Sequence, residues 1–363
     1  MRKANKDPHQ ASLVPLRQEI DRIDHQIIAL LNARMEQCQR VGEVKQSQGA
    51  AVYVPSREEA IFKKLVQFNQ GPLKEKDIRA IYREIFSSST ALQQVISVAY
   101  LGPSGTYTHQ AALKSFGSQV ALRSARSIND VFDEVEKGNA NYGVIPIENS
   151  SEGAVLDSMD RLVESPLKMV AQIHLDIQHA LLSSGAIDRI KTVYSKDQAL
   201  GQCRKWLQQH LPQAQCIPVA STTAAVLKVK NDPTAAAIAG ELNSSIYGLP
   251  ILETKIQDTT ENITRFIVIA KAEKCVPPSQ TCKTSLLLAI SDQVGALEKA
   301  LQCFSSRSIN LTKIESRPSR EKPWDYVFFI DLIGHIEDSP IKTAVEELGG
   351  QCKAVKWLGS YGV

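Results

Sequence analysis

The sequence lacks long hydrophobic runs, a secretory leader and a strong excess of one charge. Its apolar runs stay short, as at residues 286–290, whereas a membrane-spanning helix needs about 18 or more apolar residues. The opening MRKANKDPHQ is polar and has no apolar core of a signal peptide. Forty-two basic and 39 acidic residues leave a formal net charge of +3, with no basic patch. We therefore expect a cytoplasmic protein with no membrane and no nucleic-acid partner.

Cysteine pairs and nucleotide-binding loops are also missing. The seven cysteines are scattered along the chain without C-x-x-C spacing, which argues against a disulfide scaffold and against a zinc site. The loop GPSGT at residues 102–106 is not the G-x-G-x-x-G of a nicotinamide-binding turn. We therefore expect no metal and no cofactor.

The chain is long enough for more than one domain, because 363 residues correspond to two or three domains of about 150. Hydrophobic residues at 43% and charged residues at 22% are typical of globular proteins. Helices alone are predicted over 1–95, strands alternating with helices over 96–275, and a βαββαβ order over 276–363. The sequence thus predicts a multidomain protein with an all-α three-helix domain, a bilobal α/β domain and an α+β ferredoxin-like domain. The runs HLDIQHALL and ILETKIQD are predicted to cross between the two lobes.

Polar side chains interrupt the apolar stripes of the helical segment. The first predicted helix is about 35 residues long, and Arg34 lies within its apolar stripe. Pro55 and the capping box SREE predict the start of a second helix. Ser89 and Gln93 lie one turn apart on the inward face of a third. Such side chains either extend to water from a simple bundle or bind an anion.

Several motifs of this segment resemble those of the all-helical chorismate mutases: LR at 16–17, AR at 33–34, VK at 44–45 and PSRE at 55–58. In that family chorismate rearranges to prephenate in a pericyclic step, which needs fixed cations and hydrogen-bond donors but no nucleophile. The resemblance implies carboxylate contacts from Arg17, Arg34 and Arg57, ether-oxygen contacts from Lys45 and Gln93, a ring-hydroxyl contact from Glu58, and a substrate contact from Ser89. Val54 departs from the family pattern, which usually has aspartate there, and leaves a helix-entry or ligand contact unfilled.

The spacing of two of these residues predicts an oligomer. Arg17 and Lys45 are 28 residues apart on one predicted helix, about 42 Å at the helical rise. A small substrate cannot touch both within one chain. If Arg17 is functional, it must enter the site of a second subunit. We therefore expect a homodimer with intertwined antiparallel helices, or a dimer of such dimers.

Three loops of the α/β segment carry polar residues where strands end. The GPSGT loop offers N–H groups that suit a carboxylate, but it is equally an ordinary strand-to-helix turn. In PIENSSEG the polar residues either contact a ligand or cap a helix after Ser150, and the same alternatives hold for the ST pair before AAVLKV. The residues concerned are Ser104, Thr106, Asn149, Ser150, Ser221 and Thr222.

The run NITRF at 262–266, together with YLGPSGTYTHQAA, GVIPIENSSEGAV and YSKDQ, resembles the prephenate dehydratases over nearly the whole middle segment. In that family prephenate loses its ring hydroxyl and its ring carboxylate together, giving phenylpyruvate, water and carbon dioxide. The leaving hydroxyl needs a proton donor, and the departing carboxylate benefits from a poorly hydrated wall. The resemblance implies Thr264 as the donor, Phe266 as the wall, and Asn149, Gln198, Ser221 and Thr222 as orienting contacts. Glu148 is an alternative proton source if it is buried, and Arg265 either binds a carboxylate or braces the cleft.

The C-terminal segment resembles the ACT-type amino-acid-binding domain attached to prephenate dehydratases, through GAL at 295–297 and ESRP at 315–318. Free N–H groups at a helix start can hold an amino acid's carboxylate, and Glu315 its ammonium group. The resemblance implies that phenylalanine binds there and inhibits the dehydratase. The implied effector site comprises Gly295, Ala296, Leu297, Asn310, Glu315, Ser316, Arg317 and Pro318.

Together these motifs predict a bifunctional enzyme of phenylalanine biosynthesis whose small-molecule partners are chorismate, prephenate and phenylalanine. One alternative is a dehydratase with a mutase-deficient dimerisation domain weakened by Val54. Another is a cytoplasmic amino-acid-sensing binding protein, because a bilobal cleft can bind a ligand without turnover.

Overall fold

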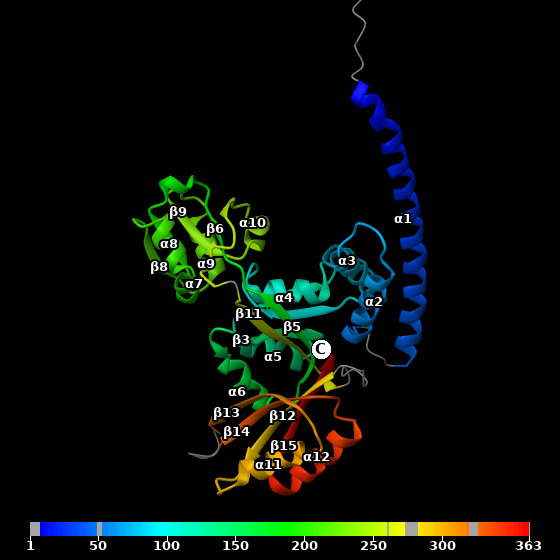
Figure 1. The fold of residues 1–363 in the computed structure, drawn as a ribbon, viewed down its shortest axis with the longest axis vertical. Coiled ribbons are helices and arrows are strands. Elements are labelled where there is room, and N and C mark those ends of the chain that lie inside the picture. The colour runs from blue at the N-terminus through cyan, green and yellow to red at the C-terminus, as the bar shows by residue number, and fades with distance from the viewer. Residues whose placement is uncertain (1–7, 49–52, 260, 273–281, 319–325, 363) are drawn as a thin grey trace, which may run out of the picture.

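The computed structural model describes residues 8–48, 53–259, 261–272, 282–318 and 326–362. Figure 1 shows three parts along the chain: the helices α1 to α3, a two-lobed α/β region, and a C-terminal sheet with two helices. The predicted boundary at residue 275 lies outside the described residues. Among the helices of the described ranges, none is long and apolar enough to cross a membrane.

The helical part consists of α1 (Pro8–Ser47), α2 (Pro55–Phe68) and α3 (Glu75–Gln93). The rings of Phe62 on α2 and Phe86 on α3 pack edge to face, with centroids 5.2 Å apart. Only the C-terminal half of α1 lies beside these helices, and the rest projects away from the molecule (Figure 1). The predicted capping box is wrong: the N-cap is Val54 rather than Ser56, two residues earlier, and Val54 makes no side-chain capping bond. The helix begins at Pro55 because proline favours the first helical position.

The first lobe is a sheet in the order β2-β1-β3-β11-β5, with the short β4 paired to β3. β11 runs antiparallel to both of its neighbours, and it is the strand that returns from the second lobe. The elements of this lobe are β1 (Ser97–Leu101), α4 (Tyr107–Phe116), β2 (Ala121–Ala125), α5 (Ile128–Glu136), β3 (Tyr142–Asn149), β4 (Gly153–Ala154), α6 (Leu156–Glu164), β5 (Lys168–Asp176) and β11 (Ile263–Ala270).

The second lobe has the strand order β10-β6-β9-β7-β8. The chain enters it after β5 and leaves it before β11, so the two predicted crossings are confirmed. Its elements are β6 (Ala180–Leu182), a 3-10 turn (Ile187–Arg189), β7 (Thr192–Ser195), α7 (Asp197–Gln202), α8 (Arg204–His210), β8 (Gln215–Pro218), α9 (Thr222–Val229), β9 (Ala235–Ala239), α10 (Leu242–Tyr247) and β10 (Ile251–Glu253).

One helix start in the first lobe was predicted wrongly. The helix expected directly after Ser150 is α6, and it begins only at Leu156. β4 intervenes and pairs with β3, so that Gly153 faces Asn149 in the ladder. Neither Asn149 nor Ser150 therefore caps a helix, and both remain at the end of β3.

The C-terminal part has the predicted βαββαβ order and a four-stranded antiparallel sheet, β13-β14-β12-β15. This is the ferredoxin-like arrangement. Its elements are β12 (Cys282–Ile290), α11 (Ala296–Ser305), β13 (Leu311–Pro318), β14 (Tyr326–Ile333), α12 (Ser339–Gln351) and β15 (Ala354–Gly362).

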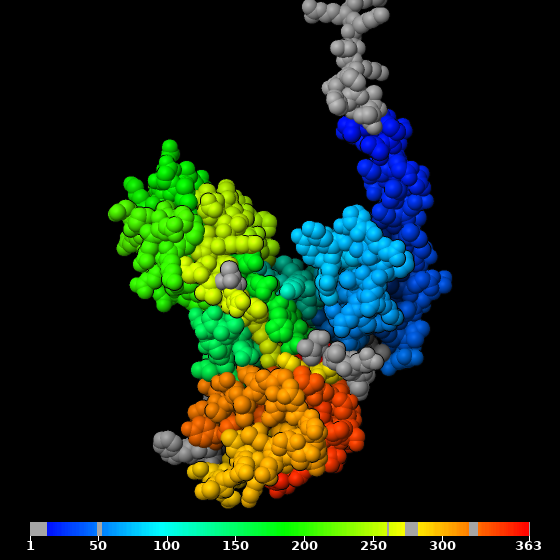
Figure 2. All heavy atoms as spheres, in the orientation of Figure 1, coloured from blue at the N-terminus to red at the C-terminus, as the bar shows by residue number. Residues whose placement is uncertain are grey.

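The C-terminal sheet packs directly on the first lobe, as Figure 2 shows. One hydrophobic core contains Ile267 and Ile269 of β11 together with Leu287, Phe329 and Tyr361 of the C-terminal sheet. Because the two parts share a close-packed core, a movement of the C-terminal sheet would displace β11, the strand that carries the predicted dehydratase residues.

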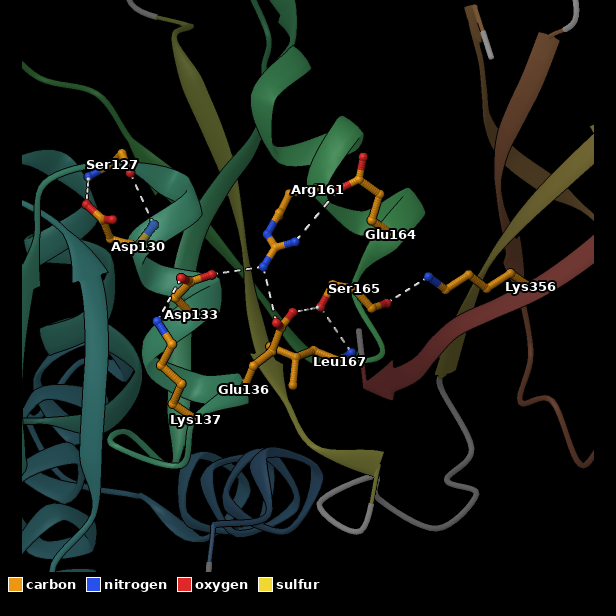
Figure 3. A network of polar contacts seen from close by, with 10 residues as sticks. All are labelled: Ser127, Asp130, Asp133, Glu136, Lys137, Arg161, Glu164, Ser165, Leu167 and Lys356. Carbon is orange, nitrogen blue, oxygen red and sulfur yellow. Dashed lines mark hydrogen bonds and ion pairs between the residues drawn. The ribbon is translucent and has the colours of Figure 1, made fainter. Parts of the chain in front are cut away.

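A polar network supports this junction (Figure 3). Arg161 on α6 donates to Asp133 at 2.9 Å and to Glu136 at 3.1 Å, both on α5. Lys356 of β15 donates to three main-chain carbonyls at the end of α6, including that of Ser165 at 2.7 Å. The ammonium group thus binds carbonyls that the helix itself leaves without partners.

Candidate active sites

In the helical part the structure brings Arg34 and Ser89 together. Arg34 Nη1 donates to Ser89 Oγ at 2.5 Å, and the Ser89 hydroxyl donates in turn to the carbonyl of Ile85 at 2.6 Å. The guanidinium also lies 5.4 Å from the centre of the Phe86 ring, where the ring's negative face attracts it. Arg34 is thus a cation held in place by α3.

Gln93 lies one turn beyond Ser89, opposite a glycine of α1. A Cβ atom on Gly42 would come within 2.7 Å of Gln93 Cγ, so the side chain occupies space that another residue at 42 would fill. Gln93 Nε2 donates to the Ser89 carbonyl at 3.3 Å, whereas its buried Oε1 has no partner among the described residues. An unpaired buried oxygen costs about 1–3 kcal/mol, which is consistent with a site that a ligand completes.

Lys45, Arg57 and Glu58 form a second group around the start of α2. Burial lowers the pKa of Lys45 and the nearby Arg57 cation lowers it further, while Glu58 opposes the shift. Burial raises the pKa of Glu58 although Arg83 Nη1 lies 2.6 Å from its Oε2. Lys45 follows Gly42 on α1 by three residues, so both groups lie along one side of that helix.

Arg17 is not part of either group. It is exposed on the projecting half of α1, and 17 residues separate it from Arg34, about 25 Å along the helix. Within one chain the structure therefore keeps Arg17 away from the other predicted mutase residues.

In the α/β part, Thr264 and Asn149 face each other on neighbouring strands. Asn149 Nδ2 donates to Thr264 Oγ1 and to Asn262 Oδ1, each at 2.8 Å. The amides of Ser151 and Glu152 donate to Asn149 Oδ1 and fix the orientation of its side chain. Because Asn149 is the donor in its bond to Thr264, the hydroxyl keeps its own proton for donation. Thr264 is 8% exposed.

A chain of polar side chains extends from this pair toward the second lobe. Asn262 donates to Gln202 Oε1 at 3.1 Å, which lies 2.8 Å from His179 Nε2. His179 Nδ1 is 2.7 Å from the Tyr107 hydroxyl. Burial lowers the pKa of His179 and raises that of Tyr107, so a neutral imidazole donates to Gln202. Its other nitrogen is an acceptor for the Tyr107 hydroxyl, which also donates to the Gln178 carbonyl at 2.9 Å.

Sequence reasoning missed Tyr107, His179 and Gln202 as site residues. Tyr107 directly follows Thr106 in the GPSGTYTHQ motif, which was a usable signal, but His179 and Gln202 belong to no motif recognised in the sequence. They lie at the crossing between the lobes and on α7. Only the fold brings these positions together.

Glu148, predicted as an alternative proton source, and Arg265, predicted either to bind a carboxylate or to brace the cleft, point away from Thr264. They are neighbours of Asn149 and Thr264 on the same two strands, and successive side chains of a strand face opposite sides. Arg265 donates to Asp331 Oδ2 and to the Tyr361 hydroxyl, each at 2.6 Å. Glu148 Oε2 lies 2.9 Å from Lys313 Nζ. Both residues therefore join the first lobe to the C-terminal sheet.

The other predicted dehydratase residues occupy local structural roles. Thr106 caps α4 and Ser221 caps α9, each accepting a main-chain N–H. Ser104 Oγ lies 2.9 Å from the Tyr100 hydroxyl, and Ser150 Oγ accepts from the amide of Ile263 at 3.0 Å. The remaining three are the buried Thr222, the half-buried Gln198 and the buried Phe266.

The β1–α4 loop also contacts the second lobe. Asn243 Nδ2 on α10 donates to the Gly105 carbonyl at 2.8 Å, and the Tyr247 hydroxyl donates to that of Ser104 at 2.7 Å. Gly105 has φ +96, and a Cβ there would lie 2.2 Å from Asn243 Oδ1. Only glycine fits, and the loop is therefore held by both lobes.

The predicted effector residues lie at the start of α11 and along β13. Gly295, with φ +78, precedes Ala296 and Leu297 of α11. Asn310 is exposed just before β13, whose side chains alternate, with Ser316 and Pro318 exposed and Glu315 and Arg317 half-buried. Arg317 Nη2 donates to Asp160 Oδ1 of α6 at 2.6 Å. Arg317 thus binds the dehydratase part in this structure.

These geometries define the class of protein: a multidomain enzyme with two separate active-site regions and a C-terminal ACT-type domain. Within the described residues, no group of three or more His, Cys, Asp or Glu side chains is placed to hold a metal ion. Family models match all three parts, as type II chorismate mutase at residues 16–94, prephenate dehydratase at 98–274 and ACT domain at 284–350.

Known proteins give the particular family. The chain is 45% identical to the bifunctional chorismate mutase/prephenate dehydratase of Aquifex aeolicus, over 96% of this chain and 97% of that one. The corresponding enzyme of Stutzerimonas stutzeri is 42% identical with the same coverage. A prephenate dehydratase structure from Arthrobacter aurescens, in complex with L-Phe, matches with a TM-score of 0.70 and 31% identity, over 74% of this chain and 90% of that one. The chain belongs to the bifunctional chorismate mutase/prephenate dehydratase family, and it is an enzyme with both activities.

Proposed function

We propose that the helical part performs the mutase reaction with the residues around α1 and α3. Arg34 holds a substrate carboxylate, and Lys45 and Gln93 donate to the ether oxygen as its bond to the ring breaks. Charge that develops on this oxygen is stabilised by donors already fixed in place, and the same contacts select the compact conformer. The support is that α3 fixes Arg34 through Ser89 and that the donor atom of Gln93, Nε2, lies one turn from Ser89, held there only by a long bond of 3.3 Å to the Ser89 carbonyl.

We propose that Thr264 is the catalytic donor of the dehydratase. Its hydroxyl donates to the leaving ring hydroxyl while the C–C bond to the departing carboxylate breaks, and the ring becomes aromatic. Asn149 orients Thr264, and the chain from Asn262 to Tyr107 fixes Asn149 from the other lobe. The observation that carries this proposal is the direction of the Asn149–Thr264 bond, which leaves the threonine proton to donate.

The experiment is to assay the two reactions separately in two variants of the full chain. Arg34→Ala is expected to abolish prephenate formation from chorismate while dehydration of added prephenate continues. Thr264→Ala is expected to do the reverse. If both reactions fall together in either variant, the division of labour is wrong.

We infer that the active form is a homodimer in which α1 of a second subunit supplies Arg17. The apolar stripe of α1 is uncovered in the single chain: Leu16 is 62% exposed and Leu30 71%. A second antiparallel α1 would cover this stripe and would bring its Arg17 toward Lys45. Ile27→Asp on the same stripe is expected to yield monomers in light scattering with loss of mutase but not dehydratase activity. A dimer that persists in this variant would refute the arrangement.

We further propose that phenylalanine binds the C-terminal domain and inhibits the dehydratase. The support is the docking of this domain on β11 through Arg265, so a rearrangement of the sheet reaches the position next to Thr264. An inhibitor that favours one arrangement shifts the population by its difference in affinity for the two. Unchanged phenylpyruvate formation at saturating phenylalanine would refute this proposal.

A further inference from the structure

Arg83 of α3 lies where the helical part meets the first lobe. Its Nη1 atom donates to Glu58 Oε2 of α2 at 2.6 Å and to the carbonyl of Ser115, in the last turn of α4, at 2.8 Å. A helix leaves its last carbonyls without partners of its own, and a cation beside them is favourable. The guanidinium also lies 5.2 Å from the centre of the Phe62 ring, whose negative face attracts it. Arg83 thus joins α2 to the dehydratase part.

Further contacts fix the helix that carries Arg83. α3 lies beside α4 (Figure 1). In the turn after α4 the amide of Gln119 donates to Ser87 Oγ at 2.9 Å, and the Ser118 hydroxyl donates to Glu84 Oε2. A Cβ atom on Gly117 would lie only 2.4 Å from Ser87 Cβ, so α3 and this turn are in close contact. The guanidinium is therefore held from both parts of the chain.

The bond to Arg83 acts on the charge of Glu58, whose side chain is only 16% exposed. Burial raises the pKa of Glu58, whereas the charge and hydrogen bond of Arg83 and the charge of Lys45 oppose this rise. Burial and Arg57 lower the pKa of Lys45, and the Glu58 charge opposes them. Tyr53 lies near the same carboxylate, and burial and Glu58 raise its pKa, so it stays neutral. The charges of Arg83, Glu58 and Lys45 thus support one another.

Glu58 can be held by Arg83 and still contact a substrate. The bond takes Oε2, and an ionised carboxylate accepts at both of its oxygens. Oε1 can therefore accept from a hydroxyl group. A protonated carboxyl would instead place a hydrogen on one oxygen and would give the Lys45 ammonium no opposite charge.

We propose that Arg83 is a positioning residue of the mutase reaction, which holds Glu58 in place and ionised. The carboxylate then accepts from the ring hydroxyl of chorismate and supports the Lys45 ammonium, which donates to the ether oxygen. Because the Ser115 carbonyl holds Arg83 in turn, the dehydratase part helps to arrange the mutase site. This inference rests on the proposed function.

The test measures prephenate formation from chorismate by full-length Arg83→Gln and Arg83→Lys across a range of pH. Dehydration of added prephenate in the same samples shows that each chain is folded. Arg83→Met, which keeps packing on Phe62, replaces Arg83→Gln if that variant loses dehydration. Arg79→Gln is the matched control, because Arg79 lies one turn earlier on α3, 5.0 Å from the same Phe62 ring, and pairs with Glu59 at 2.9 Å.

Arg83→Gln is expected to lower mutase kcat/KM about tenfold, the effect of losing one charge-assisted contact. The acidic limb of its pH profile should move to higher pH, because Glu58 loses the cation that opposes the effect of burial on its pKa. Arg83→Lys should restore most of the activity, and Arg79→Gln should match the wild type. Equal effects of Arg83→Gln and Arg79→Gln, or an unmoved acidic limb, would overturn the proposal.

A double variant tests whether Arg83 acts through Glu58. Glu58→Gln keeps the shape of the side chain without its charge, so adding Arg83→Gln to it should lower mutase activity by less than about twofold more. Losses that multiply would contradict the proposal. If Arg34→Ala retains the mutase reaction, the proposed function fails, and this comparison still decides the role of Arg83.

Discussion

The ion pair between Arg265 and Asp331 gives the sharpest test of how the C-terminal domain is joined to the dehydratase. The two side chains are 11% and 9% exposed, with Arg265 Nη1 2.6 Å from Asp331 Oδ2. Asp331 also accepts from the Ser285 hydroxyl at 2.5 Å. Asp331→Asn keeps the shape of the side chain and removes its charge, so Arg265 stays buried with only Tyr361 and the more distant Glu148, at 3.7 Å.

Removing one partner of a buried ion pair costs about 3–5 kcal/mol, because the remaining charge is left uncompensated. Since Glu148 compensates part of it, we expect a loss near the lower end, about 3 kcal/mol, in the stability of the docked C-terminal domain. Urea unfolding followed by tryptophan fluorescence measures this loss, and phenylalanine titration of the dehydratase should show weakened inhibition. The KM for prephenate should stay unchanged.

Asp292→Asn is the matched control, because Asp292 is an exposed aspartate of the same domain. It should leave stability and inhibition as in the wild type. The reasoning is refuted if Asp331→Asn preserves stability and phenylalanine inhibition while the KM for prephenate rises, since Arg265 would then act on the substrate rather than on the interface.

Three further predictions concern the active sites. Thr264→Ala should lower dehydratase kcat by about 10²–10⁴-fold, the range for a positioned proton donor, while Thr264→Ser should restore much of it in the same assay. Gly42→Ala should lower mutase kcat/KM by displacing Gln93, even though alanine favours a helix by about 1 kcal/mol; unchanged mutase activity would show that Gln93 is not needed. Because burial and Arg57 lower the pKa of Lys45, the charged amine is lost as pH rises, and mutase activity should fall at a pH below the ordinary range of lysine. Lys45→Arg should move this alkaline limb upward in a pH profile, and an unmoved limb would count against Lys45 as the donor.

Much of the fold could be predicted from sequence because the hydrophobic pattern changes twice along the chain, from helices alone to alternating strands and helices and then to the βαββαβ order. The βαββαβ order at the end and the two crossings between lobes follow from short apolar runs that are separated by polar and turn-forming residues. The capping box of α2 and the start of α6 were predicted wrongly for local reasons. Pro55 takes the first position of α2, which displaces the capping box, and β4 forms where SSEG reads as the start of a helix.

The sequence predicted a site residue only where a recognised motif contains it. Contacts between site residues depend on the strand register, which the motifs do not give. The resemblance named Thr264 as the donor and Asn149 as an orienting contact, and the strand register makes the two residues partners. Glu148 and Arg265 lie on the other side of these strands from Thr264, because a shift of one residue along a strand reverses the side that a side chain faces. Asp331 lies far in sequence from Arg265, and His179 lies far from Gln202. Hydrophobic periodicity does not predict contacts between such distant residues.

The most direct test of the central claim is a single coupled assay on the full-length wild-type chain. Chorismate is the only substrate supplied, and prephenate and phenylpyruvate are followed over time with and without phenylalanine. Two reactions on one chain predict that phenylpyruvate forms without added enzyme and that phenylalanine slows this formation. Prephenate that accumulates without any phenylpyruvate, or chorismate that stays unchanged, would contradict the account.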